Sequence, residues 1–116
     1  MDHKSILLEA NKAIAEGDHE KFLSYCTGDT RWDFVGDQTL NGIQEVREYM
    51  AKAYQQPPKV KVELMIEEGS YLTAMGTISL LNEHSELEDF EYCDVWRFEN
   101  GKLAELKAFV AKNDRM

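Results

Sequence analysis

The sequence is poor in the features that mark several classes of protein. Its 116 residues include two cysteines and two prolines, and no apolar run approaches the ~20 residues of a membrane-spanning helix. Two cysteines are too few for a disulfide-stabilised scaffold. The start of the chain is polar, and its first apolar run, residues 6–8, stops at Glu9, unlike a secretory signal. We therefore expect a cytoplasmic protein with reduced thiols and no membrane partner.

Positive charge is scarce as well. Lysine and arginine together number 13, against 22 aspartates and glutamates, which leaves a formal net charge of −9. Such an acidic surface repels the phosphates of nucleic acids, so we expect no nucleic acid partner. The three histidines show no metal-ligand spacing, and the seven glycines form no phosphate-binding loop. We expect no metal and no organic cofactor.

The first half of the chain has helical periodicity. Apolar residues at helical spacing predict a helix over residues 5–16, a short helix after Asp18, and a third that starts at Asn41 and stops before Pro57. Asn41 and Gln44 have the spacing of a capping box at the start of the third helix. The inner face of that helix includes Met50, a filler of the core or of a pocket.

The second half of the chain alternates between apolar and polar residues, which predicts strands. The expected strands are residues 30–35, 60–66, 71–81, 90–98 and 103–110. In residues 60–66 the even positions are apolar and should share one buried face. Asn100-Gly101 has the composition of a two-residue hairpin turn. Helices followed by hairpin-connected strands predict a single α+β domain over residues 1–116, with the helices packed on an antiparallel sheet.

The most informative segment is residues 90–98. Its even positions carry four aromatic residues around one acid, and they read Phe90, Tyr92, Asp94, Trp96 and Phe98. Because strand side chains alternate between faces, Asp94 shares a face with all four rings. Desolvation there should raise the pKa of Asp94. We favour a wall of a pocket, and the alternative is an acid at a sheet end that accepts a hydrogen bond from a neighbouring hydroxyl.

A second acid, Asp33, lies between Trp32 and Phe34. By alternation it shares a face with Arg31 and Val35. Neighbouring aspartate and arginine side chains are ordinary on protein surfaces. From spacing alone, Asp33 is therefore expected to be an exposed residue.

Several segments together resemble a known family. They are residues 15–18 (Ala-Glu-Gly-Asp), residues 30–36 (Thr-Arg-Trp-Asp-Phe-Val-Gly), Asn41-Gly42, and residues 92–98 followed by Asn100-Gly101-Lys102. Their order and spacing resemble the ketosteroid isomerase-like and SnoaL-like polyketide cyclase families of the nuclear transport factor 2-like superfamily. The resemblance implies three N-terminal helices on a strongly curved antiparallel sheet, which together form a cone-shaped apolar pocket.

The resemblance also implies roles for both acids. Asp33 matches the general base of the steroid isomerases, and Asp94 matches the protonated acid that donates a hydrogen bond to the developing oxyanion. The residues expected to contact a small apolar or aromatic ligand are Trp32, Met50, Phe90, Tyr92 and Trp96. Ala10 stands where the steroid isomerases have a tyrosine, so classical steroid isomerase activity is not expected. The hydroxyl could come instead from Tyr25, Tyr49, Tyr54 or Tyr92.

Two hypotheses follow for function. The first is an enzyme-like pocket that shifts a proton or closes a ring next to a carbonyl. The alternative is a non-catalytic domain that binds a small ligand or mediates dimerisation. Either would form a homodimer, which the resemblance places on the outer face of the sheet. The strand over residues 71–81 presents few charges on that face, where it carries Tyr71, Thr73, Met75, Thr77 and Ser79.

Overall fold

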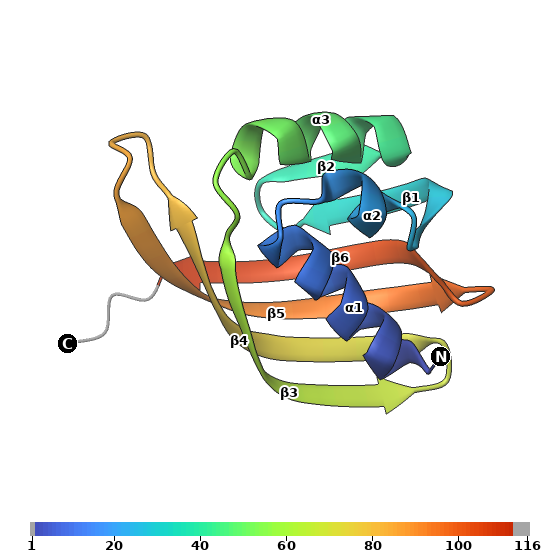
Figure 1. Cartoon of the computed structure of the whole chain (residues 1–116). Coiled ribbons are helices and arrows are strands. Elements are labelled where there is room, and N and C mark those ends of the chain that lie inside the picture. The colour runs from blue at the N-terminus through green and yellow to red at the C-terminus, as the bar shows by residue number, and fades with distance from the viewer. Residues whose placement is uncertain (1, 113–116) are drawn as a thin grey trace.

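A curved six-stranded sheet carries three helices on one of its faces (Figure 1). The computed structural model describes residues 2–112, so residues 1 and 113–116 of the expected domain lie outside the described part. The helices are α1 (His3–Ala15), α2 (His19–Leu23) and α3 (Ile43–Ala53). The strands are β1 (Cys26–Phe34), β2 (Gln38–Asn41), β3 (Lys59–Glu68), β4 (Tyr71–Leu81), β5 (Leu87–Glu99) and β6 (Lys102–Lys112). The expected α+β architecture is confirmed.

The strand order is β2-β1-β6-β5-β4-β3, and one pairing departs from the expected antiparallel pattern. The last strand, β6, lies between β5 and β1, and it runs parallel to β1. A parallel neighbour is possible because the whole chain from α3 to β5 separates the two strands in sequence. The β5–β6 hairpin turns at Asn100 and Gly101, both with positive φ, 51° and 76°, as the sequence predicts.

The helices follow their sequence signals with one correction. The carboxylate of Asp2 caps α1 by accepting a hydrogen bond from the backbone N–H of Ser5 at 2.8 Å. The expected capping box at α3 is wrong, because Asn41 belongs to β2 and Gly42 is the N-cap. Glu45, not Gln44, reaches back and accepts a hydrogen bond from the backbone N–H of Asn41 at 2.8 Å.

The expectation that residues 60–66 place all their apolar positions on one face is also wrong. A register shift between Val62 and Leu64 interrupts the β3–β4 ladder. Such a bulge reverses the alternation beyond it. Val60 and Val62 therefore pack against the core, whereas Leu64 and Ile66 are 49% and 57% exposed on the outer face of the sheet.

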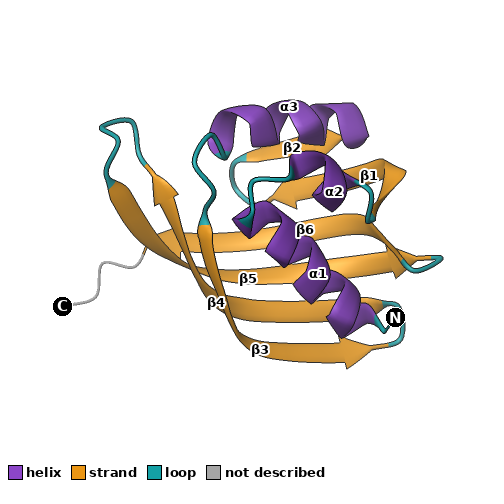
Figure 2. Cartoon of the chain, in the orientation of Figure 1, coloured by secondary structure: helices purple, strands orange, loops and turns teal. Residues whose placement is uncertain are grey.

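The core lies between the helices and the inner face of the sheet, which form two layers (Figure 2). Helix α1 contributes one apolar stripe, made of Ile6, Leu7, Ala10, Ala13 and Ile14. At the centre, Trp32 of β1 meets Trp96 of β5 and Phe22 of α2 edge to face, with ring centroids 5.9 and 5.8 Å apart. Such aromatic pairs add about 1 kcal/mol each beyond their burial.

Gly76 of β4 supplies a test of this packing. A Cβ built on Gly76 would overlap the backbone carbonyl of Lys61 on β3, at the bulge. We expect Gly76→Ala to lower the free energy of unfolding by about 2 kcal/mol or more, because backbone atoms must move to relieve the overlap. Chemical denaturation monitored by tryptophan fluorescence measures this. The matched control is Gly28→Ala, whose Cβ meets no atom within 4 Å. A change below about 0.5 kcal/mol for both variants would contradict the packing described.

Candidate functional site

A row of short side chains crosses the inner face of the sheet. Asp94 on β5 pairs with Ala74 on β4 and with Ala108 on β6. The next row along the strands is large, because Trp96 stands there between Leu72 and Leu106. The short row leaves space above the Asp94 carboxyl, and the large row fills the core beside it. The result is a cavity of about 210 Å³ with Asp94 in its floor.

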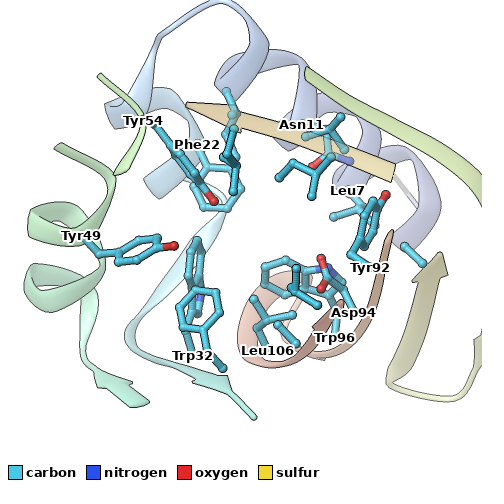
Figure 3. A pocket seen from close by; sticks show the side chains of 18 of the residues that line it. Leu7, Asn11, Phe22, Trp32, Tyr49, Tyr54, Tyr92, Asp94, Trp96 and Leu106 are labelled. Atoms are coloured by element: carbon cyan, nitrogen blue, oxygen red, sulfur yellow. The ribbon is translucent and has the colours of Figure 1, made fainter. Parts of the chain in front are cut away.

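Side chains from both layers close the cavity (Figure 3). Tyr49 reaches it from α3 and Tyr54 from just past the end of that helix, while Asn11 reaches it from α1. The remaining lining side chains are mostly apolar: Leu7, Ile14, Phe22, Trp32, Phe34, Val60, Ala74, Ile78, Leu80, Tyr92, Trp96, Leu106, Ala108 and Val110, with Asp37 at an exposed turn. The composition is that of a small-molecule site, apolar with a few polar groups.

Asp94 is the chemically distinctive group in this cavity. Within residues 2–112, no lysine, arginine or histidine belongs to the lining. Among the residues that the structure describes, the Asp94 carboxyl also has no hydrogen-bond partner. Loss of hydration is therefore uncompensated, and it raises the pKa of Asp94 to about 7. A carboxyl with this pKa populates its neutral and its charged form at neutral pH, so it can donate or accept a proton.

Three tyrosines line the cavity in different ways. The Tyr92 hydroxyl donates to the backbone carbonyl of Lys61 at 3.5 Å, and burial raises its pKa to about 12. Burial also raises the pKa of Tyr54, and the charges of Tyr49 and Asp94 raise it further. All three tyrosines are therefore neutral at neutral pH, where their hydroxyls can donate hydrogen bonds. Within residues 2–112 the hydroxyls of Tyr49 and Tyr54 have no hydrogen-bond partner.

The structure brings some of the expected site residues together and not others. Trp32, Tyr92, Asp94 and Trp96 all line the cavity. Met50 is fully buried in the core away from it, and Phe90 lies on the same face of β5 but outside the lining. Of the tyrosines considered as hydroxyl donors, Tyr25 is the one that does not reach the cavity.

Asp33 does not share a cavity with Asp94. Its neighbour Trp32 points inward, so Asp33 points to the outer face of β1, where its carboxylate accepts a hydrogen bond from the Thr39 hydroxyl at 3.4 Å. Lys107 of β6 is its cross-strand neighbour. This is the placement that spacing alone predicts.

Two polar lining residues escaped sequence reasoning. Asn11 carries a signal that could have identified it, because it lies four residues after Leu7 and three before Ile14, inside an apolar stripe. Asp37 carries none, since a charged residue in a turn is ordinary. Within residues 2–112, no group of three His, Cys, Asp or Glu side chains is arranged to hold a metal ion. No helix in the same range is long and apolar enough to cross a membrane.

The chain belongs to the SnoaL-like domain family, whose model matches residues 8–106. Among solved structures, it is similar to SalBIII, an epoxide hydrolase/cyclase-like enzyme of pyran ring formation in salinomycin. The TM-score is 0.86 at 16% identity, over 96% of this chain and 95% of that one. An NTF2-like protein of unknown function from Burkholderia pseudomallei gives a TM-score of 0.80 at 20% identity, over 93% and 90%.

A third similar structure is TerC, crystallised with polyporic acid. Its TM-score is 0.78 at 16% identity, over 91% of this chain and 88% of that one. At such identities the likeness establishes the nuclear transport factor 2-like fold. A search of curated proteins found no match to this sequence.

The raised pKa of Asp94 has a consequence for stability. Between its unfolded pKa of 3.8 and its folded pKa of about 7, the folded state binds more protons than the unfolded state, so stability falls as pH rises through this window. We expect Asp94→Asn, which keeps the shape without the charge, to be at least ~1 kcal/mol more stable than the wild type at pH 8.

The same difference should disappear near pH 4, where Asp94 is protonated in the folded protein. Urea denaturation of both proteins at the two pH values measures it, and an NMR titration of the Asp94 carboxyl carbon gives the pKa directly. A variant that is less stable than the wild type at pH 8 would show that the ionised carboxylate is held by favourable contacts.

Proposed function

We propose that this protein binds a small, neutral, carbonyl-bearing apolar or aromatic molecule in the cavity, and that protonated Asp94 donates a hydrogen bond to the carbonyl oxygen. The observation that carries this proposal is a carboxyl in the floor of an apolar cavity that no cation lines within residues 2–112; loss of hydration there raises its pKa to about 7. A neutral acid in an apolar site is a strong donor to an oxygen on which negative charge develops.

The proposed chemistry is proton transfer next to the carbonyl, as in isomerisation or ring closure. Polarisation of the carbonyl oxygen by Asp94 would make the hydrogens on the neighbouring carbon more acidic. A water molecule, or another atom of the substrate, would then accept one of these protons. Membership of the SnoaL-like family and the likeness to a cyclase-like enzyme support this reading. The base role that the resemblance implies for Asp33 stays a prediction, and the proposal is built without it because Asp33 faces away from the cavity.

The second candidate is a binding protein without catalysis. Two points favour it: buried Ala10 stands where the resemblance implies a tyrosine, and within residues 2–112 Asp94 is the one carboxyl that lies inside the cavity, since Asp37 is at an exposed turn. Both candidates need Asp94 as a donor, and they differ in whether the bound ligand exchanges protons.

2-Tetralone, a neutral two-ring ketone with exchangeable hydrogens beside its carbonyl, separates the candidates. We expect the wild type to accelerate exchange of these hydrogens in D₂O, followed by proton NMR, and Asp94→Asn to slow exchange at least tenfold. Binding, measured by quenching of tryptophan fluorescence, should weaken as pH rises past about 7, because ionised Asp94 no longer donates.

Two variants show whether the pH dependence of binding comes from Asp94. Asp94→Asn should bind with no pH dependence in this range, and Asp33→Asn, altered on the outer face, should behave as the wild type. Asp94-dependent binding without accelerated exchange would establish the binding protein and exclude the catalyst. A pH profile that is the same in the wild type and in Asp94→Asn would overturn the role of Asp94 in either candidate.

We also propose that two copies associate through the outer face of the sheet. This face exposes large apolar side chains on β3, β4 and β6 and in the turn after β1: Leu64, Ile66, Met75, Phe109 and Val35. Several of them line one shallow groove. Apolar side chains gathered on one sheet face favour a self-complementary contact.

Dimerisation is tested by sedimentation velocity at micromolar concentrations. We expect a dimer for the wild type and a monomer for Met75→Glu, because the charge would be buried in the contact. Leu8→Glu is the control, since Leu8 is similarly exposed but lies on α1. A monomeric wild type would refute the proposed interface, and dissociation of both variants would place the contact elsewhere.

A further inference from the structure

The cavity contains more polar groups than one carbonyl needs. Asn11, Tyr49, Tyr54 and Asp94 all line it, and none of their side chains has a hydrogen-bond partner among the described residues. Tyr92 differs, because its hydroxyl is directed to β3. Enclosed polar groups are normally hydrogen-bonded, since each loses hydration on burial. Groups without a partner in the protein are available to a ligand.

Asn11 is the least expected of these groups. Its position in α1 places it between Leu7 and Ile14, which also line the cavity. Asparagine is a weak helix former and gains no free energy from an apolar surrounding. Its amide can donate and accept a hydrogen bond at once. Nothing in the packing of α1 requires an amide here.

Asn11 and Asp94 lie on opposite walls of the cavity. Figure 3 shows Asn11 descending from α1 and Asp94 rising from β5, with the aromatic rings of Trp32, Tyr49 and Tyr54 to one side. A ligand that reaches Asp94 with one end therefore points its other end toward α1. The faces of these aromatic rings would contact the middle of the ligand, between its two ends.

The size and charge of the cavity narrow the ligand further. A cavity of roughly 150 Å³ accommodates benzene, and this one has about 210 Å³. Two fused rings are therefore the natural size. Within residues 2–112 the lining contains no cation that could pair with an anion, and the exposed Asp37 carboxylate repels anions. Phosphates and carboxylates are poor ligands for such a site.

We propose that the ligand is a neutral molecule of about two rings with a polar group at each end, and that Asn11 selects the group remote from Asp94. This inference rests on the proposed function, because it takes Asp94 as the anchor of the first end. The second group is a hydroxyl or carbonyl, either of which an amide can bind. Asn11 would then determine specificity without touching the reacting atoms.

A matched pair of probes tests the second anchor alone. 2-Tetralone carries the ketone only, and 6-hydroxy-2-tetralone adds a hydroxyl at the far end of the rings. We expect the hydroxyl to tighten binding to the wild type about three- to tenfold, as one hydrogen bond in an apolar site does. In Asn11→Leu, which keeps the branching of the side chain and its number of heavy atoms, the two probes should bind with equal affinity, because the hydroxyl has lost its partner.

Two further variants locate the effect. Tyr54→Phe should retain the gain in affinity that the probe's hydroxyl brings. If that gain is lost in Tyr54→Phe but kept in Asn11→Leu, the second anchor is Tyr54 and the proposal is overturned. Asp94→Asn should change the affinities for both probes by the same factor. If the proposed role of Asp94 is wrong, the pH dependence of 2-tetralone binding shows it, while the gain in affinity from the added hydroxyl remains. Equal binding of the two probes to the wild type would also overturn the proposal.

Discussion

Ionising a carboxyl among apolar side chains costs free energy, and Asp94 lies in such a place, in the floor of the cavity. The alanines on both neighbouring strands make room for the carboxyl, and within the described part of the chain no cation lines the cavity to offset this cost. The fold can tolerate such a group because the adjacent row, centred on Trp96, packs tightly against Trp32 and the helices. The row around Trp96, which stabilises the fold, and the row around Asp94, which forms the cavity floor, are thus neighbours on one face of the sheet.

The two faces of the sheet meet different demands. The inner face is covered by helices and encloses the cavity, whereas the outer face exposes apolar side chains in the described chain. The β3 bulge is responsible for part of this difference, because it moves Leu64 and Ile66 outward while Val60 and Val62 remain inside. One inserted residue, Glu63, therefore turns Leu64 and Ile66 to the surface proposed for association, while Val60 lines the cavity.

Family membership and local chemistry constrain function at different levels. The chain belongs to the SnoaL-like domain family and has its helices packed on a curved six-stranded sheet, and one fold can accommodate many chemistries. The local chemistry of this chain is the set of groups that line its cavity, which include one acid in the floor, an amide from α1, and two tyrosine hydroxyls from the α3 side. The acid that the resemblance pairs with Asp94 is on the other side of β1. The site is therefore best understood from its own residues.

The sequence by itself determined the class of fold, the helices, the long strands and the aromatic row around Asp94. These depend on local periodicity and turn residues, and side chains alternate between the faces of any strand without a bulge. Only the tertiary structure decided the parallel place of β6 beside β1 and the bulge in β3. It also decided that Asn11 and Tyr49 share a cavity that Asp33 does not enter. Residues far apart in sequence meet only when α1 and α3 pack on the sheet, and no local pattern records that packing.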